Sequence, residues 1–211
     1  MPAPVPTLEI EHGFIASGAR LVAGLDEVGR GAIAGPVMVG VVCVGPAHAT
    51  VPEGLRDSKL MTPKRREAMV ATVHEWAHSH SVGEASATEI DRLGIMGALS
   101  LAASRALAGL PEAPDVLICD GTTPFLIAEH GVAGNRGPEV VARIKADQQC
   151  ASVAAASVIA KVRRDAVMVD LHGMHPHYGW DSNKGYGAAV HTSAIREHGL
   201  CDLHRRSWNI A

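Results

Sequence analysis

The chain has 211 residues, of which 47% are hydrophobic and 19% charged, and its net charge is −3. This composition supports one sizeable buried core and excludes a disordered chain. No apolar run approaches the roughly 20 residues of a membrane span, no secretory signal is visible and the four cysteines form no C-x-x-C pair, so we expect a cytoplasmic protein without a membrane anchor or zinc cluster.

The stretch Leu21–Pro36 carries the densest chemical signal. It begins as an apolar run that predicts a buried strand, and Asp26 and Glu27 then place two carboxylates at the carboxyl end of that strand, where ligand sites of α/β sheets lie. Gly29-Arg30-Gly31 follows at once; its glycines permit close backbone approach, and its arginine suits a phosphate. Carboxylates beside a phosphate cradle indicate metal-assisted phosphate chemistry.

Two other interpretations of this stretch stay open. The spacing Gly29-x-Gly31-x-x-x-Gly35 resembles a dinucleotide-binding loop, but such a loop requires a helix directly after it, whereas Pro36 leads into a second predicted strand, VMVGVVCVG. Alternatively, Asp26 and Glu27 simply cap a tight hairpin. Acids at the ends of other strands would decide in favour of catalysis.

A polar tripeptide, Asp57-Ser58-Lys59, follows the second strand. Its hydroxyl and ammonium groups could hold a phosphate oxygen, although an ordinary polar loop is the alternative. Thr62-Pro63 then provides an N-cap and a first helical residue, which predicts a helix from about Pro63 to His80.

This helix contains a rival motif. His74-Glu75-Trp76-Ala77-His78 matches the H-E-x-x-H pattern of zinc peptidases, with two imidazoles one helical turn apart. Ser81 and Glu84 stand where the longer motif requires glycine and histidine. A surface helix is therefore favoured, and a zinc metallopeptidase remains the alternative enzyme.

The pattern of a strand ending in an acid recurs twice. Asp115–Asp120 is an apolar segment that ends in a carboxylate before Gly121, and Val140–Lys145 predicts a strand that leads to Asp147. A glycine-rich loop around Gly131–Gly137 joins them. These acids favour the catalytic interpretation of the first strand.

The remaining segments complete the predicted architecture. They are an arm at residues 1–20, a strand at Ser81–Ala85, a helix starting at Thr88 with Asp91, an alanine-rich helix at Ala151–Asp170 that packs closely on the sheet, a histidine-containing loop at His172–Trp180 and a helix at Ala188–His198. In Lys184-Gly185-Tyr186-Gly187 the ring could stack on a sugar or base, although packing over a turn explains it equally well.

Seven motifs, spread in order over about residues 20–208, resemble one known family. They are DEVGRG at Asp26–Gly31 with AGP at Ala34–Pro36, DSK at Asp57–Lys59, DG at Asp120–Gly121, KAD at Lys145–Asp147, AAAS-x-x-AKV-x-RD ending at Asp165, KGYG at Lys184–Gly187 and HRRS at His204–Ser207. The chain thus resembles bacterial ribonuclease HII, the type 2 ribonuclease H.

The resemblance implies a fold and a reaction. The fold is α/β and ribonuclease-H-like, with a central mixed sheet flanked by helices and a small helical C-terminal portion, in one domain with a core at about 1–170 and a substrate-contacting portion at about 171–211. The implied enzyme is a monomeric, metal-dependent endonuclease. It hydrolyses the RNA strand of RNA–DNA hybrids and cuts 5′ of ribonucleotides embedded in duplex DNA, leaving 5′-phosphate and 3′-hydroxyl ends, in primer removal and ribonucleotide excision repair.

Particular residues inherit roles from the resemblance. The four acids Asp26, Glu27, Asp120 and Asp147 would hold two Mg²⁺ or Mn²⁺ ions, Glu27 through its side chain or its carbonyl oxygen. Gly29, Arg30 and Gly31 would read the 2′-hydroxyl at an RNA–DNA junction, Tyr186 would stack on the following deoxyribose, and Ser58, Lys59 and Lys184 would also bind substrate. Such a site discriminates because DNA would leave its polar groups unpaired.

Three positions depart from the family pattern. Gly94 and Thr122 stand where asparagine is frequent, and Trp208 replaces a usual phenylalanine. None is one of the four acids, so we expect effects on substrate contacts and not on the reaction. A non-catalytic nucleic-acid-binding module is a third hypothesis, favoured if hybrid binds without being cut.

Overall fold

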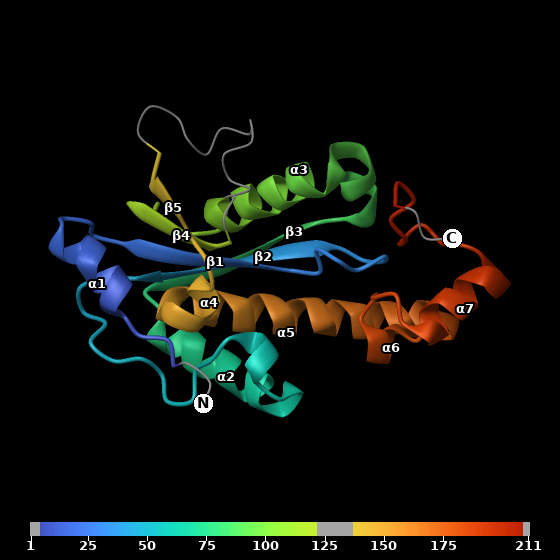
Figure 1. The fold of residues 1–211 in the computed structure, drawn as a ribbon, viewed down its shortest axis with the longest axis horizontal. Helices are drawn as coiled ribbons and strands as arrows, with labels where there is room; N and C mark the ends of the chain where they lie inside the picture. The colour runs from blue at the N-terminus through green and yellow to red at the C-terminus, as the bar shows by residue number, and fades with distance from the viewer. Residues whose placement is uncertain (1–4, 122–136, 209–211) are drawn as a thin grey trace.

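Five strands form one mixed sheet in this computed structural model, which describes residues 5–121 and 137–208 (Figure 1). Their order is β3-β2-β1-β4-β5. Strand β2 pairs antiparallel with both β1 and β3, whereas β4 pairs parallel with both β1 and β5. The strands are β1 (Val22–Val28), β2 (Val37–Val44), β3 (Ser79–Ala85), β4 (Val116–Asp120) and β5 (Glu139–Arg143).

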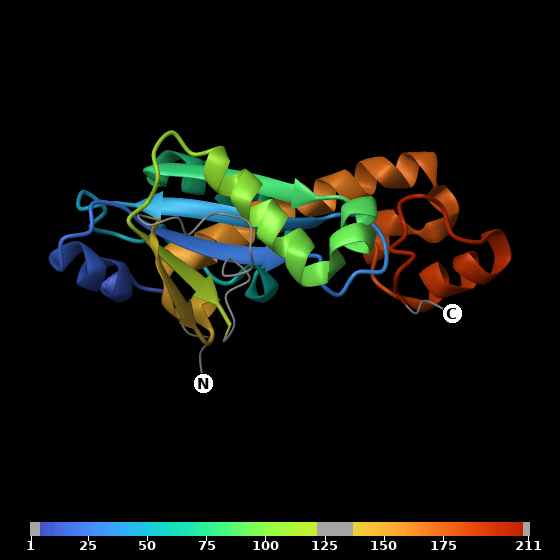
Figure 2. The same ribbon diagram turned by 90° about the horizontal axis from the view of Figure 1, so that it is seen from above.

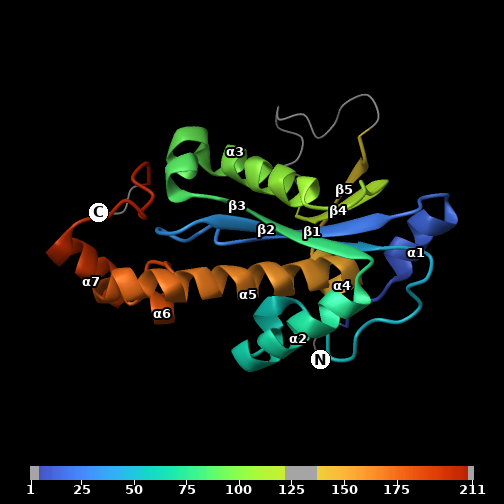
Figure 3. The same ribbon diagram turned by 180° about the vertical axis from the view of Figure 1, so that it is seen from behind.

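Helices cover both faces of the sheet, as Figure 1 and the reverse view in Figure 3 show. One face packs on α3 (Ala87–Ala108), and the other packs on α5 (Ala151–Met174) with α2 (Pro63–Trp76) beneath it. The short α4 (Ala146–Gln149) precedes α5. The predicted ribonuclease-H-like α/β fold, with a mixed sheet between helices, is confirmed. In the described segments, no helix combines the length and apolarity needed to cross a membrane.

The C-terminal portion lies beyond one end of the sheet, on the far part of α5 (Figure 2). It consists of a 3-10 turn, η3 (Pro176–Tyr178), with α6 (Trp180–Asn183) and α7 (Ala189–His198). These elements surround their own small core, formed by Ala34, Met168, Tyr178, Trp180 and Ala194. Because Ala34 and Met168 belong to the main body, this core joins the C-terminal portion to the loop after β1.

Close contact between α5 and the sheet depends on glycine. A Cβ atom at Gly24 of β1 would lie 2.2 Å from the Val153 nitrogen, and one at Gly40 of β2 would lie 2.4 Å from the Ala156 carbonyl oxygen. The facing part of α5 is built from small residues, including Ser152. The predicted close approach of the alanine-rich helix is therefore confirmed, and it holds β1 and its acids firmly against α5.

Several predicted boundaries are wrong. The expected N-terminal arm contains α1 (Glu9–Ala16), and α3 is capped by Ser86 with Glu89, in a reciprocal capping box, and not by Thr88 with Asp91. The alanine-rich helix continues to Met174 and so takes in the start of the predicted histidine loop. The predicted N-cap of α2 is confirmed, since the Thr62 hydroxyl accepts from the Arg65 amide. The Gly131–Gly137 loop lies almost wholly outside the described residues.

Candidate active site

Two of the predicted acids lie side by side at the ends of neighbouring strands. Leu25 of β1 is the register partner of Cys119 in the parallel strand β4, so Asp26 and Asp120 are the next residues on each strand. Side chains alternate along a strand, and Gly24 faces α5, which places Asp26 on the α5 side of the sheet and Glu27 on the α3 side. The adjacent acids therefore approach the strand end from opposite faces.

Asp147 completes the acidic cluster from the helix side. It lies in α4 directly after β5 and is buried. The Asp120 carboxylate accepts a hydrogen bond of 2.8 Å from the Ala146 amide, which joins the end of β4 to the start of α4. One oxygen of Asp147, Oδ1, is buried and has no hydrogen-bond partner among the described residues.

A lysine and a further acid border this cluster. The Lys59 ammonium lies 3.5 Å from Asp147 Oδ2, and Asp57 is buried, with its carboxylate accepting from the Lys59 amide at 3.0 Å. Sequence patterns did not assign Asp57 to the site. Asp57 is the first residue of the DSK tripeptide, in which only the Ser58 hydroxyl and the Lys59 ammonium were predicted to bind substrate.

The crowded carboxylates perturb one another. Burial raises the pKa of Asp26 well above its usual value, and repulsion from Glu27, Asp147 and Asp120 adds to this, while Lys59 opposes it. Burial, and then Asp57, raise the pKa of Asp147. Burial by itself lowers the pKa of Lys59, but the neighbouring carboxylates outweigh it and the net pKa is raised. Among the described residues the cluster is neutralised only in part, by Lys59 and by Arg30, whose guanidinium lies 3.8 Å from Glu27.

These residues fit divalent cations by their chemistry. Carboxylate oxygens are the ligands that Mg²⁺ and Mn²⁺ prefer, and Asp147 Oδ1, which accepts no hydrogen bond from the described residues, could serve as one of them. Within residues 5–121 and 137–208, however, no three histidine, cysteine or acidic side chains are drawn together into a preformed metal site. Instead, one oxygen of Asp120 accepts a hydrogen bond from the Ala146 amide, and one oxygen of Asp147 accepts one from the Lys59 ammonium.

A cleft of about 410 Å³ opens beside Asp26 and Glu27. Most predicted substrate-binding residues line it, namely Gly29, Arg30, Gly31, Ser58, Lys59 and Tyr186. Asp120 and Asp147 are not among its lining residues; Asp120 lies beside Asp26 at the strand ends, and Asp147 pairs with Lys59. Ser157 and Lys161 of α5 also line the cleft; both stand in the AAAS-x-x-AKV-x-RD motif, for which no site role was predicted.

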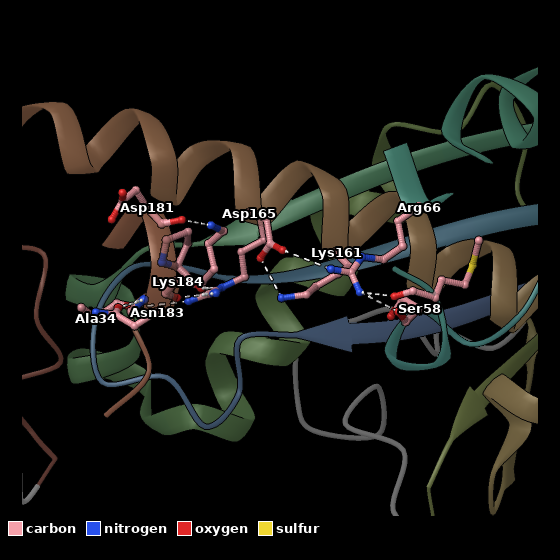
Figure 4. Close-up of polar contacts among 12 residues, drawn as sticks. Ala34, Ser58, Arg66, Lys161, Asp165, Asp181, Asn183 and Lys184 are labelled. Atoms are coloured by element: carbon pink, nitrogen blue, oxygen red, sulfur yellow. Dashed lines mark hydrogen bonds and ion pairs between the residues drawn. The ribbon is translucent and has the colours of Figure 1, made fainter. Parts of the chain in front are cut away.

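Lys161 reaches the cleft as part of an ionic network on α5. Figure 4 shows Lys161 and Arg66 both directed toward Asp165, with distances of 2.7 Å and 3.9 Å between the charged groups. Arg66 also donates to the Ser58 carbonyl at 2.8 Å. Since Lys59 follows Ser58, this network links the two lysines of the cleft wall through α2 and α5.

Tyr186 and Lys184 are placed differently. The Tyr186 ring lines the cleft, is 37% exposed and lies under the Arg164 guanidinium, which is 5.5 Å from the ring centroid. Lys184 does not line the cleft; its ammonium donates to the Asp181 carbonyl of α6 (Figure 4). The ring is therefore available for stacking, whereas the lysine would have to leave this contact to reach a ligand there.

The histidine motif does not form the site that its spacing suggests. The prediction of a helix to His80 is wrong, because α2 ends at Trp76 and β3 begins at Ser79. His78 lies between them, and His74 stacks on His80 with ring centroids 4.0 Å apart. The two imidazoles of the motif therefore do not share a helical face, as a zinc peptidase requires.

Comparison with known proteins identifies the family of this chain. The family model described as Ribonuclease HII matches residues 23–211. The chain belongs to the ribonuclease HII family. It is 46% identical to ribonuclease HII of Streptomyces avermitilis over 209 residues, covering 99% of this chain and 85% of that protein. It is likewise 46% identical to ribonuclease HII of Cereibacter sphaeroides, covering 94% and 88%.

Solved structures extend the likeness to the whole fold of this family. Ribonuclease H2 from Pyrococcus horikoshii superposes with a TM-score of 0.72 at 26% identity, covering 90% of this chain and 95% of that one. Bst-RNase HIII in complex with Mn²⁺ superposes with a TM-score of 0.70 at 25% identity, covering 92% and 68%. The predicted family is thus confirmed, and this ribonuclease HII family member is a ribonuclease H, an endoribonuclease.

Two of the three departures from the family pattern have a structural setting. Gly94 interrupts α3 with φ +69° and ψ 166°, a conformation that strains any residue with a Cβ atom, asparagine included. Trp208 packs its ring against the guanidinium of Arg205, 5.0 Å from the ring centroid. Thr122 lies outside the described residues.

Proposed function

We propose that this ribonuclease H is a metal-dependent endonuclease that cuts the RNA strand of RNA–DNA hybrids and the 5′ side of ribonucleotides embedded in duplex DNA. Its products carry 5′-phosphate and 3′-hydroxyl ends. The observation that supports this most directly is the acidic cluster, in which Asp26 and Asp120 adjoin at the strand ends and Asp147 keeps a buried oxygen without a partner among the described residues.

Four acids, Asp26, Glu27, Asp120 and Asp147, would hold the ions, Glu27 through its side chain or its carbonyl. Two bound Mg²⁺ or Mn²⁺ ions would neutralise charge on the attacking and leaving oxygens of the phosphodiester. The similar Bst-RNase HIII was crystallised in complex with Mn²⁺. A cation is favoured here because burial, and then the neighbouring carboxylates, raise the pKa of Asp26, and a nearby positive charge stabilises the ionised form of such a group.

The chain's own cleft residues would bind and orient the nucleic acid. Lys59 and Lys161 present ammonium groups to the phosphate backbone, and the glycines of Gly29-Arg30-Gly31 allow close approach to a 2′-hydroxyl. The Tyr186 ring, which has the Arg164 guanidinium over one face, would stack on the deoxyribose after the junction. Ser58 and Lys184 would contribute further phosphate contacts, the latter after leaving Asp181.

Several broader features belong to the same proposal. The enzyme would act as a monomer in the cytoplasm, in RNA primer removal and in excision of ribonucleotides from DNA. Its negative net charge does not oppose this, because the basic residues of the cleft and two bound cations supply positive charge locally.

Cleavage of a labelled DNA duplex with one ribonucleotide, in Mg²⁺ or Mn²⁺, tests the proposal. Wild type should cut 5′ of the ribonucleotide and leave an all-DNA duplex intact, and Asp120→Asn should lose at least about 100-fold in rate. Asp170→Asn, an exposed carboxylate on the same protein, is the matched control and should cut normally. Binding without cleavage in any metal would instead identify a nucleic-acid-binding module.

A further inference from the structure

Two arginines near the cleft are fully buried without a carboxylate partner among the described residues. Arg164 of α5 and Arg205 of the C-terminal tail each have 0% exposure. In the part of the chain that the structure describes, every hydrogen bond from either guanidinium goes to a main-chain carbonyl oxygen. Burying a cation is costly, and carbonyls satisfy its hydrogen bonds without supplying a counter-charge. We therefore do not expect that these two arginines are buried in order to stabilise the fold as a whole.

The carbonyls belong to the two loops that line the cleft. Arg205 donates to Gly29 at 2.7 Å, to Arg30 at 3.0 Å and to Gly35 at 3.1 Å. Arg164 donates to Ala34 at 3.2 Å and, from the other end of its fork, to Lys184 at 2.9 Å. The pair therefore ties the loop after β1, residues 29–36, to the tyrosine loop, residues 184–187.

This bonding turns particular amides away from Arg205. In a trans peptide the carbonyl and the following N–H point in opposite directions, so drawing the Gly29 and Arg30 carbonyls onto Arg205 directs the amides of Arg30 and Gly31 away from it. Neither amide donates to any acceptor among the described residues, and both residues line the cleft. Two N–H donors thus remain available to a ligand oxygen.

Arg164 also contacts the aromatic ring of Tyr186, which lines the same cleft as these amides. Its guanidinium lies 5.5 Å from the centroid of the Tyr186 ring, and its Nε donates to the Pro36 carbonyl at 2.9 Å. No larger residue could replace Gly29 beside it, because a Cβ there would lie 2.1 Å from Arg164 Nε. One side chain therefore contacts both the loop after β1 and the stacking ring, and it adds to the direct main-chain bonds from Ile33 and Ala34 to the Gly185 carbonyl.

We propose that Arg164 and Arg205 are positioning residues that set the selectivity for ribonucleotides, by fixing the amides of Arg30 and Gly31 at a defined distance from the Tyr186 ring. Neither arginine touches the substrate. This inference rests on the proposed function, since it assigns the recognition of the 2′-hydroxyl to a geometry that these two side chains maintain. Lysine cannot replace either residue, because it lacks the planar fork that reaches several carbonyls at once.

Binding without cleavage tests the proposal. In an Asp120→Asn background, affinity is measured for a DNA duplex with one ribonucleotide and for the same all-DNA duplex. Arg205→Lys and Arg164→Lys should each lower the ratio of the two affinities about tenfold, with the all-DNA affinity changing less than about twofold. Arg206→Lys and Arg163→Lys alter exposed neighbours and should leave the ratio unchanged.

Amide hydrogen exchange without nucleic acid separates this inference from the proposed function. The lysine variants should exchange about tenfold faster in residues 29–36 and 184–187 while α3 keeps wild-type protection. An unchanged affinity ratio, or unchanged exchange in both loops, overturns the proposal. Faster exchange throughout α3 as well also overturns it, because the arginines would then only stabilise the whole fold. If the parent protein itself shows no preference for the ribonucleotide, the proposed function fails, whatever the exchange shows.

Discussion

Replacing Gly24 by alanine should damage both stability and catalysis, because β1 and α5 touch at this residue. The new Cβ would lie 2.2 Å from the Val153 nitrogen and 2.3 Å from the Ser152 carbonyl carbon, whereas ordinary contacts begin near 3.4 Å. Both obstructing atoms belong to the backbone of a long helix and cannot rotate away. The helix must therefore retreat by roughly 1 Å, at a cost of about 3 kcal/mol, the upper part of the usual range for overpacking.

The same displacement should separate the candidate catalytic acids. Asp26 lies two residues after Gly24, whereas Asp147 lies in α4, directly before the part of α5 that is pushed away. A misplacement of about 1 Å between groups that share metal ions can cost about 100-fold in rate. Gly24→Ala should therefore lose about 100-fold in single-turnover cleavage, even where the protein is fully folded.

Urea unfolding followed by circular dichroism measures the first effect, and the midpoint should fall by about 1–2 M. Gly13→Ala is the matched control: this helical glycine has open space around it, and alanine there should stabilise by about 0.5–1 kcal/mol without changing the cleavage rate. A Gly24→Ala protein that unfolds within about 0.5 kcal/mol of wild type would refute the packing argument.

Three further predictions concern charge and capping. Asp26→Asn should abolish cleavage yet raise the melting temperature of the metal-free protein, because burial and the neighbouring carboxylates disfavour the ionised Asp26. A lower melting temperature would contradict this reasoning. Burial, and then His191, lower the pKa of His204 from 6.5 to about 4, so the folded protein keeps the ring neutral while the unfolded chain takes up a proton. The free energy of unfolding should thus fall by up to about 3 kcal/mol as the pH falls from 6.5 toward 4. Measured by urea unfolding, the free energy of His204→Gln should depend less on pH over this range. An equal pH dependence in wild type and variant would show that His204 is not the cause. Ser86→Ala should remove the α3 cap and cost about 1 kcal/mol of unfolding free energy with cleavage unchanged, as thermal denaturation and the duplex assay would show.

Local sequence patterns predicted the framework of the site well. Apolar runs that end in an acid predicted β1 and β4, because a buried strand needs only a few consecutive hydrophobic residues. The first charge, Asp120, does end β4, whereas β1 continues past Asp26 and Glu27 to Val28. Thr62 predicted the start of α2, since an N-cap acts within one turn. These signals depend on neighbours in the chain, so they can be read without the fold.

Other boundaries depended on partners far along the chain. The helical pattern of α2 continues toward His80 in sequence, but the segment from Ser79 pairs with β2 and becomes β3 instead. In the same way α1 has no side-chain N-cap, and it is held by packing of residues such as Phe14 against the core. Tertiary contacts thus ended a locally helical pattern at β3 and supported a helix without a side-chain cap at α1.

The sequence by itself determined the family, the order of the strand-end acids and the residue types at the cleft, because short motifs with fixed spacing carry that information. Only the tertiary structure showed that Asp57 and Lys161 join the site and that Arg164 and Arg205 hold its loops. The Arg205 guanidinium bonds to a carbonyl 176 positions earlier in the chain. Main-chain carbonyls are the same at every residue, so no sequence pattern marks the acceptor, and a buried arginine cannot be told from a surface one until the fold encloses it.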